Sequence, residues 1–88
     1  MREFWTPEFT HQYESFLKSD RVLIDDLLDE ILDSHTSRDM RLSLRRVAGS
    51  SVWSTRQIRL SRTFIRVAWC YAHDSRDSIV MVTIGEFP

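Results

Sequence analysis

The sequence predicts an α+β fold, in which an N-terminal helical hairpin is followed by an antiparallel β-meander within a single domain spanning residues 1–88. Apolar residues recur every three to four positions up to about residue 34, and every second position beyond residue 38. Short polar stretches interrupt the second half where strands have to turn. A chain of 88 residues that is 42% apolar is long enough for one small core.

The N-terminal residues predict a short edge strand and a first helix. Residues 2–5 form the strand. Thr6 is a good N-cap, Pro7 fits the first helical position, and Glu8 complements the helix dipole. We therefore expect a helix that begins after Thr6 and runs to about Lys18.

A second helix is predicted over Asp20–Ser34, with Ser19-Asp20 as its N-cap. Its apolar face carries Leu23, Ile24, Leu27, Leu28, Ile31 and Leu32. The opposite face is acidic and carries Asp25, Asp26, Asp29, Glu30 and Asp33. Like charges at this spacing disfavour an isolated helix. We expect compensation from a basic partner or from the next segment, through Arg38, Arg41 or Arg45.

After this helix, apolar residues recur at every second position, which predicts two strands over residues 40–44 and 52–60. Residues 40–44 alternate between apolar residues and arginine or serine, and a turn follows at 49–51. Residues 52–60 alternate again and are expected to form one continuous strand. Ser61-Arg62 is the predicted bend.

Two longer strands complete the meander. Residues 63–72 place Ile65, Val67, Trp69 and Tyr71 on one face, and Phe64, Arg66, Ala68 and Cys70 on the other. A polar turn at 73–77 leads to a strand over 78–84. Because both faces of that last strand are mostly apolar, we expect it to be central and covered.

The net charge of −1 conceals a strong segregation of charge along the chain. Residues 1–34 hold nine acidic residues against three basic ones, and residues 35–77 hold nine arginines against three acidic residues. The basic half therefore predicts a polyanionic or acidic partner. Eleven of the twelve cations are Arg, whose planar fork suits phosphate, although codon bias is an equally good explanation of that ratio.

The remaining composition narrows the functional classes. The lone Cys70 excludes an intramolecular disulfide framework and any Cys-rich metal site. The three histidines lack ligand spacing, so we expect no metal and no cofactor. No apolar run reaches the ~20 residues of a membrane span, and the N-terminus has no apolar signal-peptide core. We expect a cytoplasmic protein without a membrane partner.

Four stretches, in their order and spacing, resemble the RelE/ParE superfamily of toxin–antitoxin toxins: RRVAG (45–49), VWSTRQIRL (52–60), FIRVAWCY (64–71) and IVMVTIG (79–85). The resemblance covers nearly the whole chain. It implies a curved sheet whose convex face packs on the two helices and whose concave face is basic. It also implies a cognate antitoxin that lies along the toxin and covers its apolar grooves.

The resemblance implies two kinds of activity. Ribosome-dependent members cleave mRNA without a metal, because the 2′-hydroxyl of the message attacks the adjacent phosphate with help from Arg, Lys, His and Tyr side chains. Gyrase-poisoning members share the fold and lack that set of residues.

Individual residues match the family pattern to different degrees. Arg66 lies where the family has the Arg of a Tyr-Arg strand start, although Ile65 replaces the aromatic residue. Arg59 matches the Arg of the preceding strand, and Arg45 and Arg46 match the basic positions before a glycine.

The segment that follows Ile-Gly in the family pattern differs in this sequence. Members that cleave RNA usually follow Ile-Gly with a His, Arg or Asp and a Tyr, whereas this chain continues from Ile84-Gly85 with Glu86-Phe87-Pro88. The expected general acid and base have no counterpart there. Whether the protein is a metal-independent mRNA endoribonuclease is therefore left open.

Strand parity selects the candidate site residues. Arg59, Arg62, Arg66 and one of Arg45 or Arg46 are expected to form a phosphate-binding patch; the alternatives are solvated charge and, for Arg66, an ion pair with Asp29 or Glu30 on the helix.

Two other side chains complete the candidate set. Trp53 shares parity with Arg59 and is the candidate for stacking on a base, whereas Trp69 and Tyr71 are expected in the core. His73 ends a strand and is a candidate for proton transfer, because imidazole is the side chain most often used as a general acid or base, although a histidine in a polar turn is usually only solvated.

Two functions follow as hypotheses. The first is a toxin that inhibits translation, by cleaving ribosome-bound mRNA or by occupying that site. The second is a non-catalytic binding protein of the same fold, either a gyrase-directed toxin or a degenerate toxin acting as a partner-binding or regulatory module.

Overall fold

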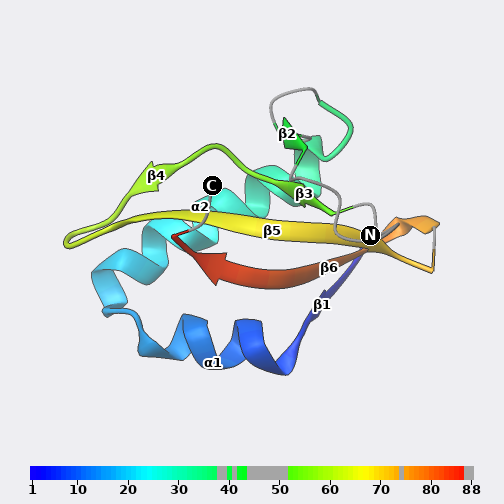
Figure 1. The fold of residues 1–88 in the computed structure, drawn as a ribbon. Coiled ribbons are helices and arrows are strands. Elements are labelled where there is room, and N and C mark those ends of the chain that lie inside the picture. Colours follow the sequence, from blue (N-terminus) through cyan, green and yellow to red (C-terminus); the bar gives the residue numbers. More distant parts are fainter. Residues whose placement is uncertain (38–39, 41, 44–51, 74, 87–88) are drawn as a thin grey trace.

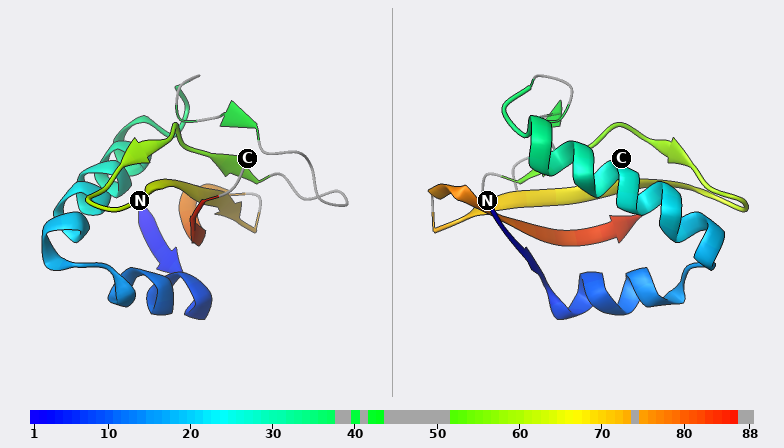
Figure 2. Two further views of the ribbon diagram at one scale, coloured as in Figure 1. Left: turned by 60° about the vertical axis from the view of Figure 1, so that its left-hand side comes forward. Right: turned by 180° about the vertical axis from the view of Figure 1, so that it is seen from behind.

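A computed structural model of the chain describes residues 1–37, 40, 42–43, 52–73 and 75–86. Two helices lie on one side of a sheet (Figures 1 and 2). Helix α2 (Lys18–Ser34) crosses behind β5 (Phe64–Ala72), and α1 (Pro7–Ser15) runs beside β6 (Ser75–Gly85). The turn expected at 49–51 and part of the strand expected over 40–44 lie outside the described residues. The elements are β1 (Arg2–Trp5), α1 (Pro7–Ser15), α2 (Lys18–Ser34), β2 (Leu42–Ser43), β3 (Trp53–Ser54), β4 (Ile58–Arg59), β5 (Phe64–Ala72) and β6 (Ser75–Gly85).

The sheet has the strand order β1-β6-β5-β3-β2, with β4 pairing separately with β5. The predicted α+β class and the central position of the last strand are confirmed, because β6 lies between β1 and β5. All strand pairs are antiparallel except β1–β6, which is parallel. Both helices and the other strands separate β1 from β6 in sequence, so no hairpin turn dictates their direction.

The first helix begins as its sequence predicts. The Thr6 hydroxyl accepts a hydrogen bond from the Phe9 backbone N–H at 3.0 Å, and Pro7 occupies the first helical position. The helix ends at Ser15, three residues earlier than expected. The Gln12 amide oxygen accepts a hydrogen bond from the Ile84 N–H at 2.8 Å, so α1 also satisfies a backbone donor of β6.

The predicted N-cap of the second helix is wrong. Helix α2 begins at Lys18 after Leu17, which makes no side-chain cap. Asp20 is buried instead, and its carboxylate accepts hydrogen bonds from the backbone N–H of Ser61 at 3.0 Å and from the Ser61 hydroxyl at 2.8 Å. The local pattern predicts that Asp20 caps its own helix, but the side chain instead binds Ser61, which is distant in sequence. These hydrogen bonds connect α2 to the turn between β4 and β5.

The core lies between α2 and one face of the sheet. The predicted faces of β5 are confirmed, since Ile65, Val67 and Trp69 are at most 1% exposed. Leu23 differs from its helix neighbours and is 45% exposed. Packed against the three β5 residues are Ile24, Leu27, Leu28, Ile31, Ile79, Met81 and Ile84.

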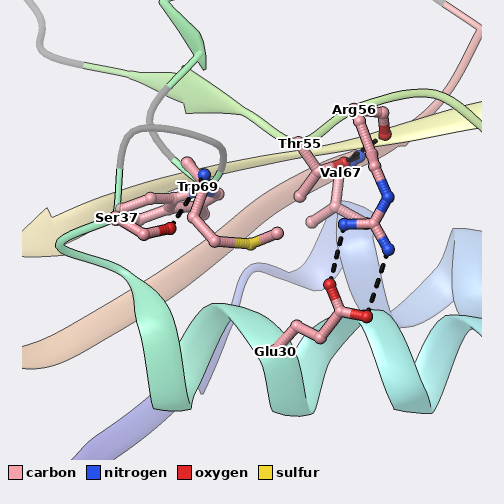
Figure 3. Close-up of polar contacts among 7 residues, drawn as sticks. Glu30, Ser37, Thr55, Arg56, Val67 and Trp69 are labelled. Carbon is pink, nitrogen blue, oxygen red and sulfur yellow. Dashed lines mark hydrogen bonds and ion pairs between the residues drawn. The ribbon is translucent and has the colours of Figure 1, made fainter.

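The strand expected over 52–60 is broken into β3 and β4. Trp53 pairs with Trp69, whereas Ile58 pairs with Ile65, so the register shifts by one residue between the two short strands. Thr55 lies at this shift and is fully buried. Its hydroxyl accepts a hydrogen bond from the Val67 N–H at 3.1 Å, so a side chain replaces a backbone acceptor of the ladder (Figure 3). The slip reverses which residues face the helices.

Candidate nucleic-acid interface

Arg59 and Arg66 lie on the same face of the sheet, the face turned away from the helices. Arg59 is the direct cross-strand partner of Phe64, and Arg66 lies two residues further along β5. The adjacent pair Ile58 and Ile65 faces the core. Because successive side chains alternate between the two faces, the two arginines share the outer one.

Arg66 is oriented by the irregular segment between β3 and β4. It is half-buried, and its Nη1 donates a hydrogen bond to the Thr55 carbonyl oxygen at 3.0 Å. This hydrogen bond uses one of its five N–H donors. Its cross-strand partner is Gly85, and a Cβ added there would meet no atom of the described residues within 4 Å. Within the described part of the chain, the β6 position opposite Arg66 therefore carries no side chain.

The alternative expectation for Arg66, an ion pair with Asp29 or Glu30, is wrong. The Glu30 carboxylate accepts hydrogen bonds from the two terminal guanidinium nitrogens of Arg56, Nη1 and Nη2, at 2.7 and 3.1 Å (Figure 3). Helix α2 packs on the core face of β5, whereas Arg66 points to the other face. Hydrogen bonds from Arg56 lower the pKa of Glu30, because they stabilise its charged form.

Arg62 extends the cationic surface into the turn that joins β4 and β5. The turn is closed by a hydrogen bond from the Leu60 N–H to the Thr63 carbonyl at 2.7 Å, and the Asp20 carboxylate binds Ser61 beside it. Arg62 is exposed. We call Arg59, Arg62 and Arg66 the arginine face.

Other groups border the arginine face. The exposed Phe64 ring lies 5.7 Å from the guanidinium carbon of Arg59. Glu86 accepts a hydrogen bond from the Thr63 hydroxyl. Within the described part of the chain, neither Arg59 nor Arg66 forms an ion pair.

Trp53 does not share the face of Arg59, and that expectation from parity is corrected. Its ring stacks on Trp69 at 5.2 Å between centroids and meets Tyr71 edge-on at 5.3 Å, on the side of the sheet that faces the helices. The register shift after β3 is the reason, because it reverses parity between Trp53 and Arg59. A base-stacking role for Trp53 stays a prediction.

His73 is separated from the arginine face by almost the whole length of β5. It is exposed in the turn before β6, with a positive φ of 51°. Seven residues of extended strand, at about 3.3 Å each, put it roughly 23 Å from Arg66. The structure does not bring His73 and the arginines into one site, and its proton-transfer role stays a prediction.

The other candidate positions add no described group to this site. Arg45 and Arg46 lie outside the described residues. Among the residues that the structure describes, no cluster of three or more His, Cys, Asp or Glu side chains is arranged to hold a metal ion. No helix in the described part is long and apolar enough to cross a membrane.

Phe64 is the bordering residue that sequence reasoning missed. Its side chain is 47% exposed and lies between Arg59 and Arg66 on their shared face. The signal was present in the alternation of residues 63–72, which puts Phe64 on the same face as Arg66. The cross-strand pairing with Arg59 depends on the register shift, which the sequence did not reveal.

The fold is that of a RelE-type toxin. The isolated E. coli RelE toxin superposes with a TM-score of 0.70 at 14% identity, covering 99% of this chain and 84% of that one. RelE-fold similarity extends to the intact E. coli RelBE toxin–antitoxin complex, with a TM-score of 0.67, 12% identity and coverage of 99% and 96%. A mutant of E. coli RelE in the free state gives a TM-score of 0.68 at 13% identity, over 97% and 81% of the two chains.

No protein-family model matches the sequence, and a search of curated proteins gives no significant match. At 12–14% identity the structural likeness establishes the fold, which confirms the resemblance inferred from the sequence at that level. The activity has to be argued from the arginine face.

Proposed function

We propose that this protein is the toxin of a toxin–antitoxin pair and that it inhibits translation by binding ribosome-associated mRNA through the arginine face. The observation that carries the proposal is the position of Arg59, Arg62 and Arg66 together at one end of a RelE-type sheet. Guanidinium groups bind phosphate in a bidentate manner, and phosphate contacts dominate affinity for nucleic acids.

Arg66 is the central phosphate-binding residue in this proposal. Its hydrogen bond to the Thr55 carbonyl holds the guanidinium before any ligand arrives, so less side-chain entropy is lost on binding. Such a group can also stabilise the negative charge that develops on a phosphate during cleavage. Arg59 and Arg62 are exposed and supply adaptable contacts on either side.

An antitoxin is the proposed protein partner. A groove of about 220 Å³ between α2 and β4 is lined by the apolar residues Leu23, Leu27 and Ile58 and by the charged residues Asp26, Glu30, Arg56 and Arg59. Leu23 is 45% exposed there. An apolar segment of an antitoxin would cover this surface and would reach Arg59 at the same time.

The proposed site of action is the cytoplasm, where ribosomes and mRNA are found. The test is to induce the protein in bacteria that lack its antitoxin and to follow growth and the incorporation of labelled amino acids. We expect translation to stop and growth to arrest, and we expect an Arg59→Ala/Arg66→Ala variant to lose both effects. Unchanged growth with folded wild-type protein contradicts the proposal.

Two further measurements separate the mechanisms. Primer extension on a translated message distinguishes cleavage, which produces new 5′ ends, from occupancy of the site, which does not. Labelled thymidine incorporation reports DNA replication. A block of DNA replication with intact translation would instead assign the protein to the gyrase-directed class of toxins.

A further inference from the structure

We propose that Phe64 is a stacking platform for an unpaired nucleobase, placed so that Arg59 and Arg66 bind the phosphates on either side of that base. This inference rests on the proposed function and assigns its ligand class as single-stranded RNA.

The exposure of Phe64 distinguishes it from the rest of its strand. Its ring is 47% exposed, whereas the next residues of β5 that face the helices, Ile65 and Val67, are at most 1% exposed. A large apolar ring in water is unfavourable by about 25 cal/mol for each Å². Among the residues that the structure describes, its neighbours on the same face of β4 and β5 are Arg59 and Arg66, which leave the ring partly open to solvent.

The two arginines lie on different sides of the ring. Arg59 is the cross-strand partner, a relationship that places side chains about 5 Å apart at Cβ. Arg66 lies two residues along the strand, roughly 7 Å away. The guanidinium carbon of Arg59 lies over the ring, 5.7 Å from its centroid. A base that stacks on the ring therefore displaces the Arg59 side chain toward the phosphate on that side, and Arg66 lies toward the other flanking phosphate.

The chemistry of the surroundings selects the ligand. A molecule that covers Phe64 must present a flat apolar face and carry negative charge close to it, because cations border the ring on both sides. A nucleotide has both properties, and every base has a π-face that an aromatic side chain can accept. The bases of a duplex are stacked on each other and are not free to do this, so the ligand is single-stranded.

The open space beside Gly85 fits the same interpretation. Gly85 pairs with Arg66 across β5 and β6 and brings no side chain to this face. A Cβ at that position would meet no atom of the described residues within 4 Å. Among these residues, Gly85 therefore places no side chain in the way of a phosphate that approaches Arg66.

The experiment compares Phe64→Leu with Phe64→Trp, using a short single-stranded RNA that carries one 2-aminopurine. Leucine retains apolar area and removes the ring, whereas tryptophan retains the ring. We expect the wild type and Phe64→Trp to bind and to quench the 2-aminopurine. We expect Phe64→Leu to bind about tenfold more weakly with little quenching. Its salt dependence should equal that of the wild type, because no phosphate contact is lost.

Phe4→Leu is the matched control. Phe4 is 46% exposed and lies on the same face, but on the edge strand β1, opposite Val80 and away from Arg59 and Arg66. Its substitution should change neither affinity nor quenching. Thermal melts test whether each variant is folded. We expect every variant to be folded, because each replaced ring is partly exposed.

Each outcome decides the question. If the wild type binds RNA and arrests translation while Phe64→Leu binds and quenches as the wild type does, the stacking inference is wrong and the proposed function stands. Binding by the wild type without quenching, or no binding to this RNA, also overturns the stacking inference. Failure of the wild type both to bind RNA and to arrest translation overturns the proposed function itself.

Discussion

At the scale of single residues, Arg59 and Arg66 carry the same charge but are held differently. Arg66 is half-buried and donates to the Thr55 carbonyl, whereas Arg59 is exposed and rests near the Phe64 ring. The difference separates an RNA-binding contribution from a structural one. In the proposed site, replacing Arg59 removes a phosphate ligand and its contact with the Phe64 ring, whereas replacing Arg66 also leaves the Thr55 carbonyl with one partner fewer.

We therefore expect Arg59→Ala and Arg66→Ala each to weaken binding to single-stranded RNA and to reduce its salt dependence by about one phosphate contact. Arg59→Ala should leave the free energy of unfolding unchanged, while Arg66→Ala should lower it by about 1 kcal/mol. Fluorescence anisotropy across a salt series measures the first effect, and urea denaturation measures the second.

Arg76→Ala is the control for this pair, because Arg76 is exposed near the start of β6, at the end of the sheet opposite the arginine face. It should keep the salt dependence of the wild type. If Arg66→Ala instead unfolds the protein, Arg66 is a structural residue and its assignment to the RNA site fails.

At the scale of elements, the sequence predicts well the features that depend on neighbouring residues, such as helix starts and the alternation of a strand. Thr6 and Pro7 start α1 where expected, and the alternation of β5 gave the correct core face. The register shift at Thr55 had no comparable signal, because it depends on hydrogen bonds between Thr55 and Val67 on another strand. Its consequence was the incorrect face for Trp53.

Tertiary partners account for the other differences. Asp20 looked like a helix cap and instead binds Ser61, forty-one residues away. The acidic face of α2 was expected to attract Arg38, Arg41 or Arg45, which lie outside the described residues, and the ion pair that the structure describes is formed by Arg56. Charge pattern predicted that an arginine was needed there, but distance in sequence gave no means of choosing which one.

The Arg56–Glu30 pair joins α2 to the segment between β3 and β4, and it should make stability depend on pH. Hydrogen bonds from Arg56 lower the pKa of Glu30 in the folded protein, so its contribution is complete above the unfolded value of ~4.3 and is lost as the pH falls through the folded value. The side chains are 46% and 49% exposed, which limits the contribution to about 1 kcal/mol or less.

Glu30→Gln should accordingly be less stable than the wild type at about pH 7, and the difference should shrink at an acidic pH below the unfolded value of ~4.3, as Glu30 becomes protonated first in the unfolded and then in the folded state. Urea denaturation at the two pH values measures it. Asp33→Asn, at an exposed position on the same helix, is the control and should show no such convergence. A difference for Glu30→Gln that persists at low pH would mean that packing, not the ion pair, is responsible.

At the scale of the whole molecule, the segregation of charge along the sequence becomes a segregation in space. Helix α2 lies on one side of the sheet (Figure 2) and carries the exposed Asp29 and Asp33. Arg59 and Arg66 alternate with the core residues Ile58 and Ile65 and so belong to the other face, although Arg59 also reaches the groove that Asp26 lines. Two further acidic residues of α2 have partners, since Asp25 accepts a hydrogen bond from Tyr13 at 2.7 Å and Glu30 binds Arg56. If the proposed function holds, this distribution should attract an approaching polyanion to the side of the arginines and repel it from the side of α2.

Neutralising the exposed acids tests which side meets the RNA. The variant Asp29→Asn/Asp33→Asn leaves Glu30 with Arg56 and removes two negative charges from the helix side. We expect affinity for single-stranded RNA to stay the same or to rise slightly at low salt, and the rise to vanish at high salt, because charges separated by more than about 10 Å are screened. Stability should change by no more than ~1 kcal/mol.

Glu8→Gln/Glu14→Gln, which removes two exposed charges from α1, shows how much of any rise follows from net charge alone. A several-fold loss of RNA binding by folded Asp29→Asn/Asp33→Asn would place the binding surface on the helices and overturn the assignment to the arginine face.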